Sequence, residues 1–338
     1  MSITYQVLGE PGRDNAVFAT VNTGHSQHRL LFDCGEGCLD AVPRADVQAI
    51  EGLFFSHFHI DHIAGFDRFF RANWFRAEPP VRIFGPAGAR SVLHHRLQGY
   101  TWNLVENLTG EVRVCELVDE SLRTSRYLAP EGFAVEHRFS EAPFDGVVYA
   151  NDAFRVEARV MHHGVPCLAY LVREADRSNV DSASLTRAGL PEGPWLQRLK
   201  DRLVPDEAEI EISGAMHLVG ELRKQLLTRQ AGDSLAYLTD FRVRNEQEED
   251  ELVDFLEGCG VLICEDTFRD DDLDLARQSH HLTSSDVGRL ASRVAPEQLI
   301  VFHVSDRYTE AELRGQLAQV RRRFERAAFP PHWRLSAP

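Results

Sequence analysis

Three histidines and one aspartate fall within six residues of the sequence, directly after an apolar run. The segment reads Leu53-Phe54-Phe55-Ser56-His57-Phe58-His59-Ile60-Asp61-His62. The run predicts a buried strand, and residues two apart in an extended segment point the same way. His57 and His59 can therefore bind one metal ion together. Asp61 and His62 follow as the chain turns into a helix, and they can face a second ion. Such ligands suit zinc, while manganese or iron stays open.

Four side chains from one loop cannot complete two metal sites, so further ligands must come from other segments. Three candidates stand at the ends of predicted strands, namely His163, Asp240 and His303. A turn-forming aspartate or a capping histidine is the ordinary alternative at each position taken alone. Together with the first cluster they form one set of seven predicted ligands: His57, His59, Asp61, His62, His163, Asp240 and His303.

Strand patterns and helix patterns alternate in both halves of the chain, which predicts an α/β fold with two packed sheets covered by helices. The predicted strands lie near 5–8, 16–21, 30–32, 53–55, 81–84, 154–160, 168–172, 235–239, 261–264 and 299–302. The predicted helices cover 63–75, 89–97, 246–257, 284–293 and 310 to about 326. Residues 174–213 are polar and contain Pro191-Glu192-Gly193-Pro194. We therefore expect a single domain, 1–338, with an inserted arm at about 174–213.

Charge and cysteine content restrict the function and the compartment. The formal net charge is −15, with 52 acidic and 37 basic residues, which argues against a protein that coats nucleic acid nonspecifically. A local cationic groove remains compatible with this balance. The six cysteines lack metal-ribbon spacing and predict reduced thiols in the cytoplasm. We find no signal peptide and no run of about 18 apolar residues, so we expect no membrane span.

The ordered motifs resemble those of the metallo-β-lactamase superfamily, and within it those of ribonuclease Z, the tRNA 3′-processing endonuclease. The matching segments are Leu31–Gly37, Phe55–Gly65, His163–Pro166 with Tyr170, Gly189–Pro194 with Leu199-Lys200, Cys264–Phe268 with His280–Thr283, and Phe302–Tyr308. The metal motif alone is specific only for the superfamily. The Gly-Pro element of the arm and the pair Glu265 and His281 narrow the resemblance to ribonuclease Z.

The resemblance implies an αββα sandwich and a dinuclear zinc phosphodiesterase. His57, His59 and His163 would bind one zinc ion, Asp61, His62 and His303 would bind the other, and Asp240 would bridge them. The two ions would activate the attacking water at neutral pH. Asp61 would orient or deprotonate that water, and His281, oriented by Glu265, would protonate the leaving oxygen. Arg307 is a candidate for binding the phosphate.

The resemblance also implies a homodimer that removes 3′ trailers from tRNA precursors. Arg198, Lys200 and Arg202 are the candidate tRNA contacts in the arm. Residues 173–215, however, contain six basic and nine acidic residues, a net charge of −3, and a segment that binds phosphates should be basic. Thr239-Asp240-Phe241 also replaces the family's usual Gly-Asp-Thr. A hydrolase of a small phosphodiester or another ester, without tRNA specificity, therefore stays open as the alternative.

Overall fold

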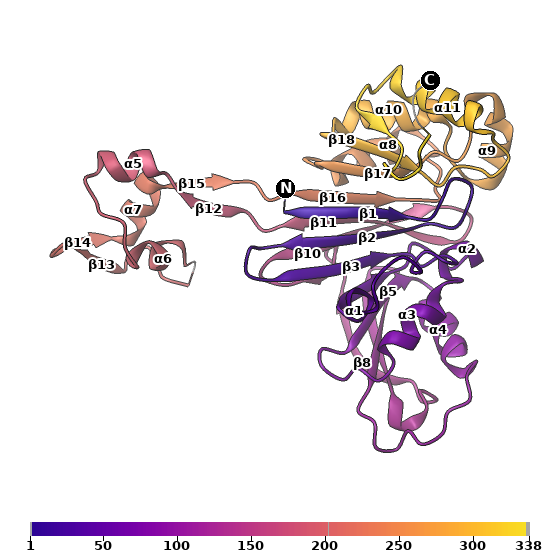
Figure 1. Cartoon of the computed structure of the whole chain (residues 1–338), viewed down its shortest axis with the longest axis horizontal. Helices are drawn as coiled ribbons and strands as arrows, with labels where there is room; N and C mark the ends of the chain where they lie inside the picture. The colour runs from indigo at the N-terminus through magenta and orange to yellow at the C-terminus, as the bar shows by residue number, and fades with distance from the viewer. Residues whose placement is uncertain (1, 202, 336–338) are drawn as a thin grey trace. The chain divides into compact units, whose positions relative to one another are not determined.

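The chain, described from a computed structural model that covers residues 2–201 and 203–335, divides into two compact units (Figure 1). The larger unit contains the residues up to Glu174 and those from Asp233 onward, and the smaller unit is Ala175–Gly232. Within the described ranges, no helix is long and apolar enough to cross a membrane.

The first sheet of the larger unit has eight strands that are neighbours in chain order. They are β1 (Ile3–Leu8), β2 (Ala16–Asn22), β3 (Gln27–Phe32), β4 (Ile50–Phe54), β5 (Val81–Pro86), β6 (Glu111–Val118), β7 (Ser121–Leu128) and β8 (His137–Pro143). Strands β3 to β6 pair in parallel, and the flanking pairs are antiparallel. Parallel neighbours need crossover connections, and α1 (Arg44–Gln48), α2 (Ile60–Ile63), α3 (Phe66–Asn73) and α4 (Ala89–Gln98) lie in these connections.

The second sheet has seven strands. Their order is β19 (Ala327–Ala328), β18 (Gln298–Phe302), β17 (Val261–Glu265), β16 (Ser234–Leu238), β11 (Pro166–Glu174), β10 (Phe154–His162) and β9 (Val147–Ala150). Strands β16 to β19 pair in parallel. Nearly every residue of β16, β17 and β18 is buried, as expected for strands covered on both faces.

Two hydrophobic clusters give the larger unit four layers, helix–sheet–sheet–helix (Figure 1). The inner faces of the sheets meet at Phe32, whose ring centroid lies 5.7 Å from that of Tyr170 and 5.6 Å from that of Tyr237. The outer face of the first sheet packs against α3 and α4. The second sheet packs against α8 (Glu246–Phe255), α10 (Ser284–Val294) and α11 (Glu310–Arg321). The predicted sandwich of two packed sheets flanked by helices is therefore confirmed.

The helix predicted over 63–75 forms over a shorter range, as α3, and residue 63 belongs to a separate helix, α2. The chain forms α2 and α3 with a break at Ala64-Gly65. Gly65 packs on the loop after β3, where a Cβ atom would lie only 2.2 Å from the Gly35 carbonyl oxygen. Because that loop must approach so closely, the helix that ends the metal motif is short. The last helix is also shorter than predicted and ends at Arg321.

The smaller unit has its own core and extends beyond the predicted arm boundary. Its elements are β12 (Arg177–Val180), α5 (Ser182–Arg187), α6 (Trp195–Lys200), β13 (Glu209–Ile212), β14 (Ala215–Leu218), α7 (Val219–Leu226) and β15 (Leu227–Gln230). The unit ends at Gly232 rather than 213 because β15 pairs with β12 and α7 contributes Val219, Leu222 and Leu226 to the core. With these bounds it contains eight basic and nine acidic residues, so its net charge is only −1.

Candidate metal centre

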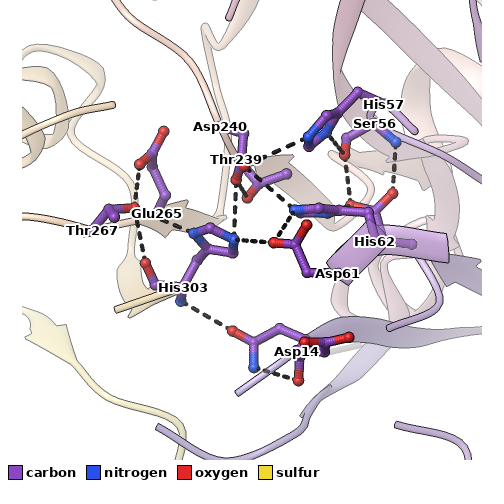
Figure 2. Close-up of polar contacts among 12 residues, drawn as sticks. Asp14, Ser56, His57, Asp61, His62, Thr239, Asp240, Glu265, Thr267 and His303 are labelled. Atoms are coloured by element: carbon purple, nitrogen blue, oxygen red, sulfur yellow. Dashed lines mark hydrogen bonds and ion pairs between the residues drawn. The ribbon is translucent and has the colours of Figure 1, made fainter. Parts of the chain in front are cut away.

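The seven predicted ligands come together where strands of both sheets end. Figure 2 shows His57, Asp61, His62, Asp240 and His303 of this set. The histidine motif follows β4, His163 follows β10, Asp240 follows β16 and His303 follows β18. Their ligand atoms form two groups, and within each group all atoms lie within 4.8 Å of one another. The first group is His57, His59, His163 and Asp240, and the second is Asp61, His62, Asp240 and His303.

Asp240 belongs to both groups, and its two oxygens face different neighbours. Oδ2 lies 3.6 Å from His57 Nε2 and 3.4 Å from His62 Nε2, and it lies 3.6 Å from His163 Nε2. Oδ1 lies 3.3 Å from His303 Nε2. Burial raises the pKa of Asp240, but the neighbouring His303 and His62 outweigh burial and lower it well below its usual value. The carboxylate is therefore ionised, as a bridging ligand must be.

Two buried nitrogens indicate that this donor set fits a metal. His57 Nε2 and His62 Nε2 are buried, and neither has a hydrogen-bond partner among the described residues. Buried polar atoms are nearly always partnered. Donors about 2.0–2.1 Å from a tetrahedral zinc ion stand roughly 3.3 Å apart, close to the 3.3–3.6 Å separations around Asp240. Burial and His62 lower the pKa of His57 to about 2, so this imidazole is neutral. The arrangement suits a divalent metal, commonly zinc.

The second nitrogen of four of the predicted ligand histidines contacts a fixed partner. His57 Nδ1 lies 3.0 Å from Ser56 Oγ, His62 Nδ1 2.7 Å from Asp33 Oδ2, His163 Nδ1 3.2 Å from the His280 carbonyl oxygen, and His303 Nδ1 3.2 Å from Thr267 Oγ1. Such outer contacts fix the tautomer and the ring orientation of a metal-binding histidine. The Nε2 atoms are thereby directed toward Asp240.

Asp33 is a central residue of the site to which the sequence assigned no role. It is fully buried and accepts hydrogen bonds from the Ser56 amide at 2.7 Å and the Ser56 hydroxyl at 2.6 Å. It also contacts His62 Nδ1 at 2.7 Å and accepts from the Tyr237 hydroxyl at 2.7 Å. The signal was present, because Asp33 follows a strand end as Asp240 and His303 do.

These three residues at strand ends share an unusual backbone conformation. Asp33, Asp240 and His303 have φ angles of 55°, 52° and 50°. The left-handed region is sparsely populated by residues other than glycine, and such conformations concentrate at functional sites where surrounding contacts impose them. Here the turn directs each side chain across the strand end into the cluster.

Glu265, which is buried, and His281, which is half-buried, form a pair beside the predicted metal ligands. Glu265 Oε2 lies 2.7 Å from His281 Nδ1, and Glu265 Oε1 accepts the Phe241 amide at 2.7 Å. Thr267 Oγ1 lies 2.6 Å from Glu265 Oε2 and so links the pair to His303. Burial lowers the pKa of His281, but the Glu265 carboxylate outweighs burial and raises the pKa to about 9. His281 is therefore protonated at neutral pH.

The predicted substrate-binding residues fall into two places. In the larger unit, Arg307 donates from Nε to Ser305 Oγ at 3.1 Å. Its guanidinium carbon lies 5.3 Å from the centroid of the Phe268 ring, which packs against His281 at 5.8 Å. In the smaller unit, Arg198 and Lys200 line an open groove of about 810 Å³ with Trp195. Arg202 lies outside the described residues.

The fold and the site define a hydrolase of the metallo-β-lactamase fold. A metallo-β-lactamase fold protein from Bacillus subtilis aligns with a TM-score of 0.55 and 14% identity, over 97% of this chain and 95% of its own. The short form of human tRNase Z aligns with a TM-score of 0.51 and 16% identity, over 91% and 94%. A family model described as anti-Pycsar protein Apyc1 matches residues 14–137.

The full-length comparison is more specific. The chain is 42% identical over 327 residues to ribonuclease Z of Deinococcus radiodurans, and the match covers 97% of each protein. It is 26% identical to ribonuclease Z of Methanocaldococcus jannaschii over 84% of this chain and 78% of that one. The chain belongs to the ribonuclease Z family, and it is a metal-dependent hydrolase.

Proposed function

We propose that this protein is a dinuclear zinc endoribonuclease that removes 3′ trailers from tRNA precursors. The observation that carries the proposal is the shared position of Asp240, which gives two donor groups of four ligands each, in a chain related over its whole length to ribonuclease Z. One tetrahedral site uses four ligands, so seven side chains with one shared carboxylate accommodate two ions.

Two zinc ions bound by these residues would activate a water molecule at neutral pH and neutralise charge on the scissile phosphate. Asp61 would accept a hydrogen bond from that water and orient it. Its side chain is 41% exposed, and Oδ2 lies 3.4 Å from His62 Nε2 and 3.6 Å from His303 Nε2. Burial raises the pKa of Asp61, but the nearby imidazoles of His303 and His62 outweigh burial and lower it below its usual value. Such a weak base suits orientation of the water better than removal of its proton.

His281 would donate its proton to the leaving ribose oxygen. Glu265 accepts from the Nδ1 side, so Nε2 is the atom available to give up a proton. The charge of Glu265 also stabilises the protonated ring before the reaction. Arg307, which lies on the Phe268 ring beside His281, would bind a phosphate oxygen through its planar guanidinium. Asp61 would thus orient the water, His281 would protonate the leaving oxygen, and Arg307 would bind the phosphate.

The smaller unit would supply the RNA-binding surface. Its groove is lined by Trp195, Arg198 and Lys200, and also by Asp201 and Glu211. An aromatic face beside cationic groups suits stacked bases and phosphates. With its full extent the unit is nearly neutral in a chain of net charge −15. It also contains Lys200 and Lys224, the only lysines of the sequence.

Replacing Arg198 and Lys200 together by alanine is expected to weaken binding of a 3′-extended tRNA. The slope of log affinity against log salt should flatten by about 0.9 for each phosphate that the variant no longer neutralises. Hydrolysis of bis(p-nitrophenyl) phosphate should fall far less, because it needs no distant binding energy. Arg187→Ala is the matched control, since Arg187 lies on α5 outside the groove and donates to Ser184 Oγ at 2.7 Å. Equal losses on both substrates would mean that the smaller unit serves only the integrity of the fold.

Chemical labelling tests the same surface without substitution. An amine-reactive reagent can modify only Lys200, Lys224 and the terminal amine. The side chains of both lysines are exposed, but only Lys200 lines the groove. Bound precursor should protect Lys200 and leave the labelling rate of Lys224 unchanged, as read by peptide mass spectrometry. Equal labelling of Lys200 with and without RNA would argue against the groove as the binding surface.

We further propose a cytoplasmic homodimer, on the basis of family membership. The apolar side chains of α3 cannot form the dimer interface, because Phe69 and Phe70 are buried in the core of the chain itself. Sedimentation at micromolar concentration should give a species of twice the chain mass of 38.3 kDa. A species of 38.3 kDa would refute the dimer.

A further inference from the structure

Beside His163 and His281 lies a group of basic side chains to which the reaction above gives no role. They are His162 at the end of β10, Arg242 in the loop after β16, Arg277 on α9 (Leu273–Ser279), and His280 directly after that helix. They come from three separate parts of the sequence. We call these four residues the basic cluster.

Direct contacts join the cluster to the metal centre. The Arg242 amide donates to the His162 carbonyl at 2.8 Å, and Arg242 Nη1 donates to the Arg277 carbonyl at 3.3 Å. The rings of His162 and His280 lie edge to face, with centroids 5.1 Å apart. The His280 carbonyl accepts from His163 Nδ1 at 3.2 Å. The cluster is therefore continuous with a predicted metal ligand and with the histidine that would protonate the leaving oxygen.

The permanent charges of this cluster are those of Arg242 and Arg277, whereas His162 lies near both Arg244 and Glu248. Neither Arg242 nor Arg277 has a carboxylate ion-pair partner among the described residues, and His280 Nδ1 is buried there without a hydrogen-bond partner. Arg244, two residues after Arg242, differs, because it donates from Nε to Glu248 at 2.7 Å. An anionic ligand would supply the counter-charge that Arg242 and Arg277 lack.

We propose that the basic cluster binds the RNA phosphate adjacent to the scissile one, on the side of the leaving oxygen. This inference rests on the proposed function and assigns a second phosphate position to the same site. The side follows from the chain itself, since His280 immediately precedes His281 and packs against Gly164, where a Cβ atom would lie 3.1 Å from His280 Cδ2. The guanidinium groups of Arg242 and Arg277 offer the paired donors that suit a phosphate.

A cycle that combines a protein variant with a modified substrate tests the contact. Precursors carry an uncharged methylphosphonate in place of one phosphate, next to the scissile linkage on the leaving-oxygen side or on the opposite side. Arg242→Gln should lower kcat/KM on the natural precursor by about tenfold to a hundredfold, as expected when a hydrogen bond to a charged group is removed. Wild-type protein should lose a similar factor on the leaving-side methylphosphonate. The variant should lose little more on that substrate, because the interaction is already absent.

Binding of the product gives a readout that does not depend on turnover. Mature tRNA contains the leaving-side phosphate, whereas the released trailer does not. Arg242→Gln should weaken the Kd for mature tRNA by a similar factor and leave the Kd for the trailer unaltered. Arg277→Gln, at an exposed position on α9, is a second variant that should repeat this result. Arg244→Gln is the matched control and should retain wild-type values, because Glu248 already neutralises that arginine.

The possible outcomes separate the two proposals. Wild-type cleavage of the precursor with additive losses at the leaving-side linkage would overturn the subsite and leave the proposed function standing. Coupling to the opposite linkage would also overturn it. Failure of the wild-type protein to cleave any tRNA precursor would overturn the proposed function and the subsite with it.

Discussion

Replacing His57 by alanine is expected to remove bound metal and activity together. His57 Nε2 is buried, lacks a hydrogen-bond partner among the described residues and faces the Asp240 carboxylate at 3.6 Å. Without this nitrogen the first donor group has only three members. The buried Asp240 carboxylate also loses one of the imidazoles that face it. Metal analysis of protein purified without chelator should find close to two zinc equivalents in the wild type and at most one in the variant. Turnover of every phosphodiester should fall by about a thousandfold or more, because a metal ion contributes several kcal/mol of transition-state stabilisation.

Two comparison variants separate removal of a ligand from a general disturbance. Asp33→Ala removes the partner of His62 Nδ1 rather than a ligand, so metal affinity should fall by about tenfold to a hundredfold and excess zinc should restore much of the activity. His95→Ala changes an exposed histidine on α4 and should retain both equivalents. A His57→Ala protein with two bound ions and wild-type turnover would contradict the assigned donor set.

His281→Ala should separate substrates by the quality of their leaving group. A ribose oxygen needs a proton as it leaves, whereas an activated nitrophenolate leaves without one. Positioned proton transfer contributes about 10²- to 10⁴-fold, so cleavage of a tRNA precursor should fall by a factor in that range. Hydrolysis of bis(p-nitrophenyl) phosphate should fall much less. Steady-state kinetics of both substrates on the same zinc-loaded preparation provides the comparison.

Glu265→Gln provides the matched variant for this prediction. The glutamine amide keeps the size of the side chain but removes its negative charge. In the wild type, that charge raises the pKa of His281 against the effect of burial. The variant should therefore show the same selectivity between substrates as His281→Ala, with a smaller loss on the precursor. If both substrates lost activity equally in both variants, with metal content preserved, the pair would serve the architecture of the site rather than proton transfer.

The metal centre could be predicted because its signals are local. A dense histidine motif and three polar residues after apolar strands predicted one set of seven ligands. The structure places these seven residues in two groups that share Asp240. The role of Asp33 was not predicted, because it depends on contacts with residues distant in sequence. Tyr237, which donates to Asp33, is 204 positions away. The basic cluster was not predicted for the same reason, since His162, Arg242 and Arg277 share no sequence motif.

The predicted fold class was correct, while several element boundaries were not. No strand was predicted between 98 and 153, although β6 to β9 lie there. Almost all residues of β8 are exposed, and an exposed strand carries no apolar alternation. β6 does carry buried apolar residues, so its pattern was present in the sequence and was missed. The smaller unit was cut short at 213 because its closing strand, β15, is recognised only by its pairing with β12. The excess of acidic residues that argued against RNA binding came largely from that early boundary.

Cleavage of a 3′-extended tRNA by the zinc-loaded protein, with both product ends mapped, tests the proposed function most directly. We expect a single endonucleolytic cut that releases the trailer. We also expect a 3′-hydroxyl on the tRNA, because the ribose oxygen is the leaving group that His281 would protonate, and a 5′-phosphate on the trailer. Removal of metal by a chelator should abolish the cut, and added zinc should restore it. Rapid hydrolysis of a nitrophenyl phosphodiester with the tRNA precursor left intact would contradict the proposed function and favour a hydrolase of small phosphodiesters.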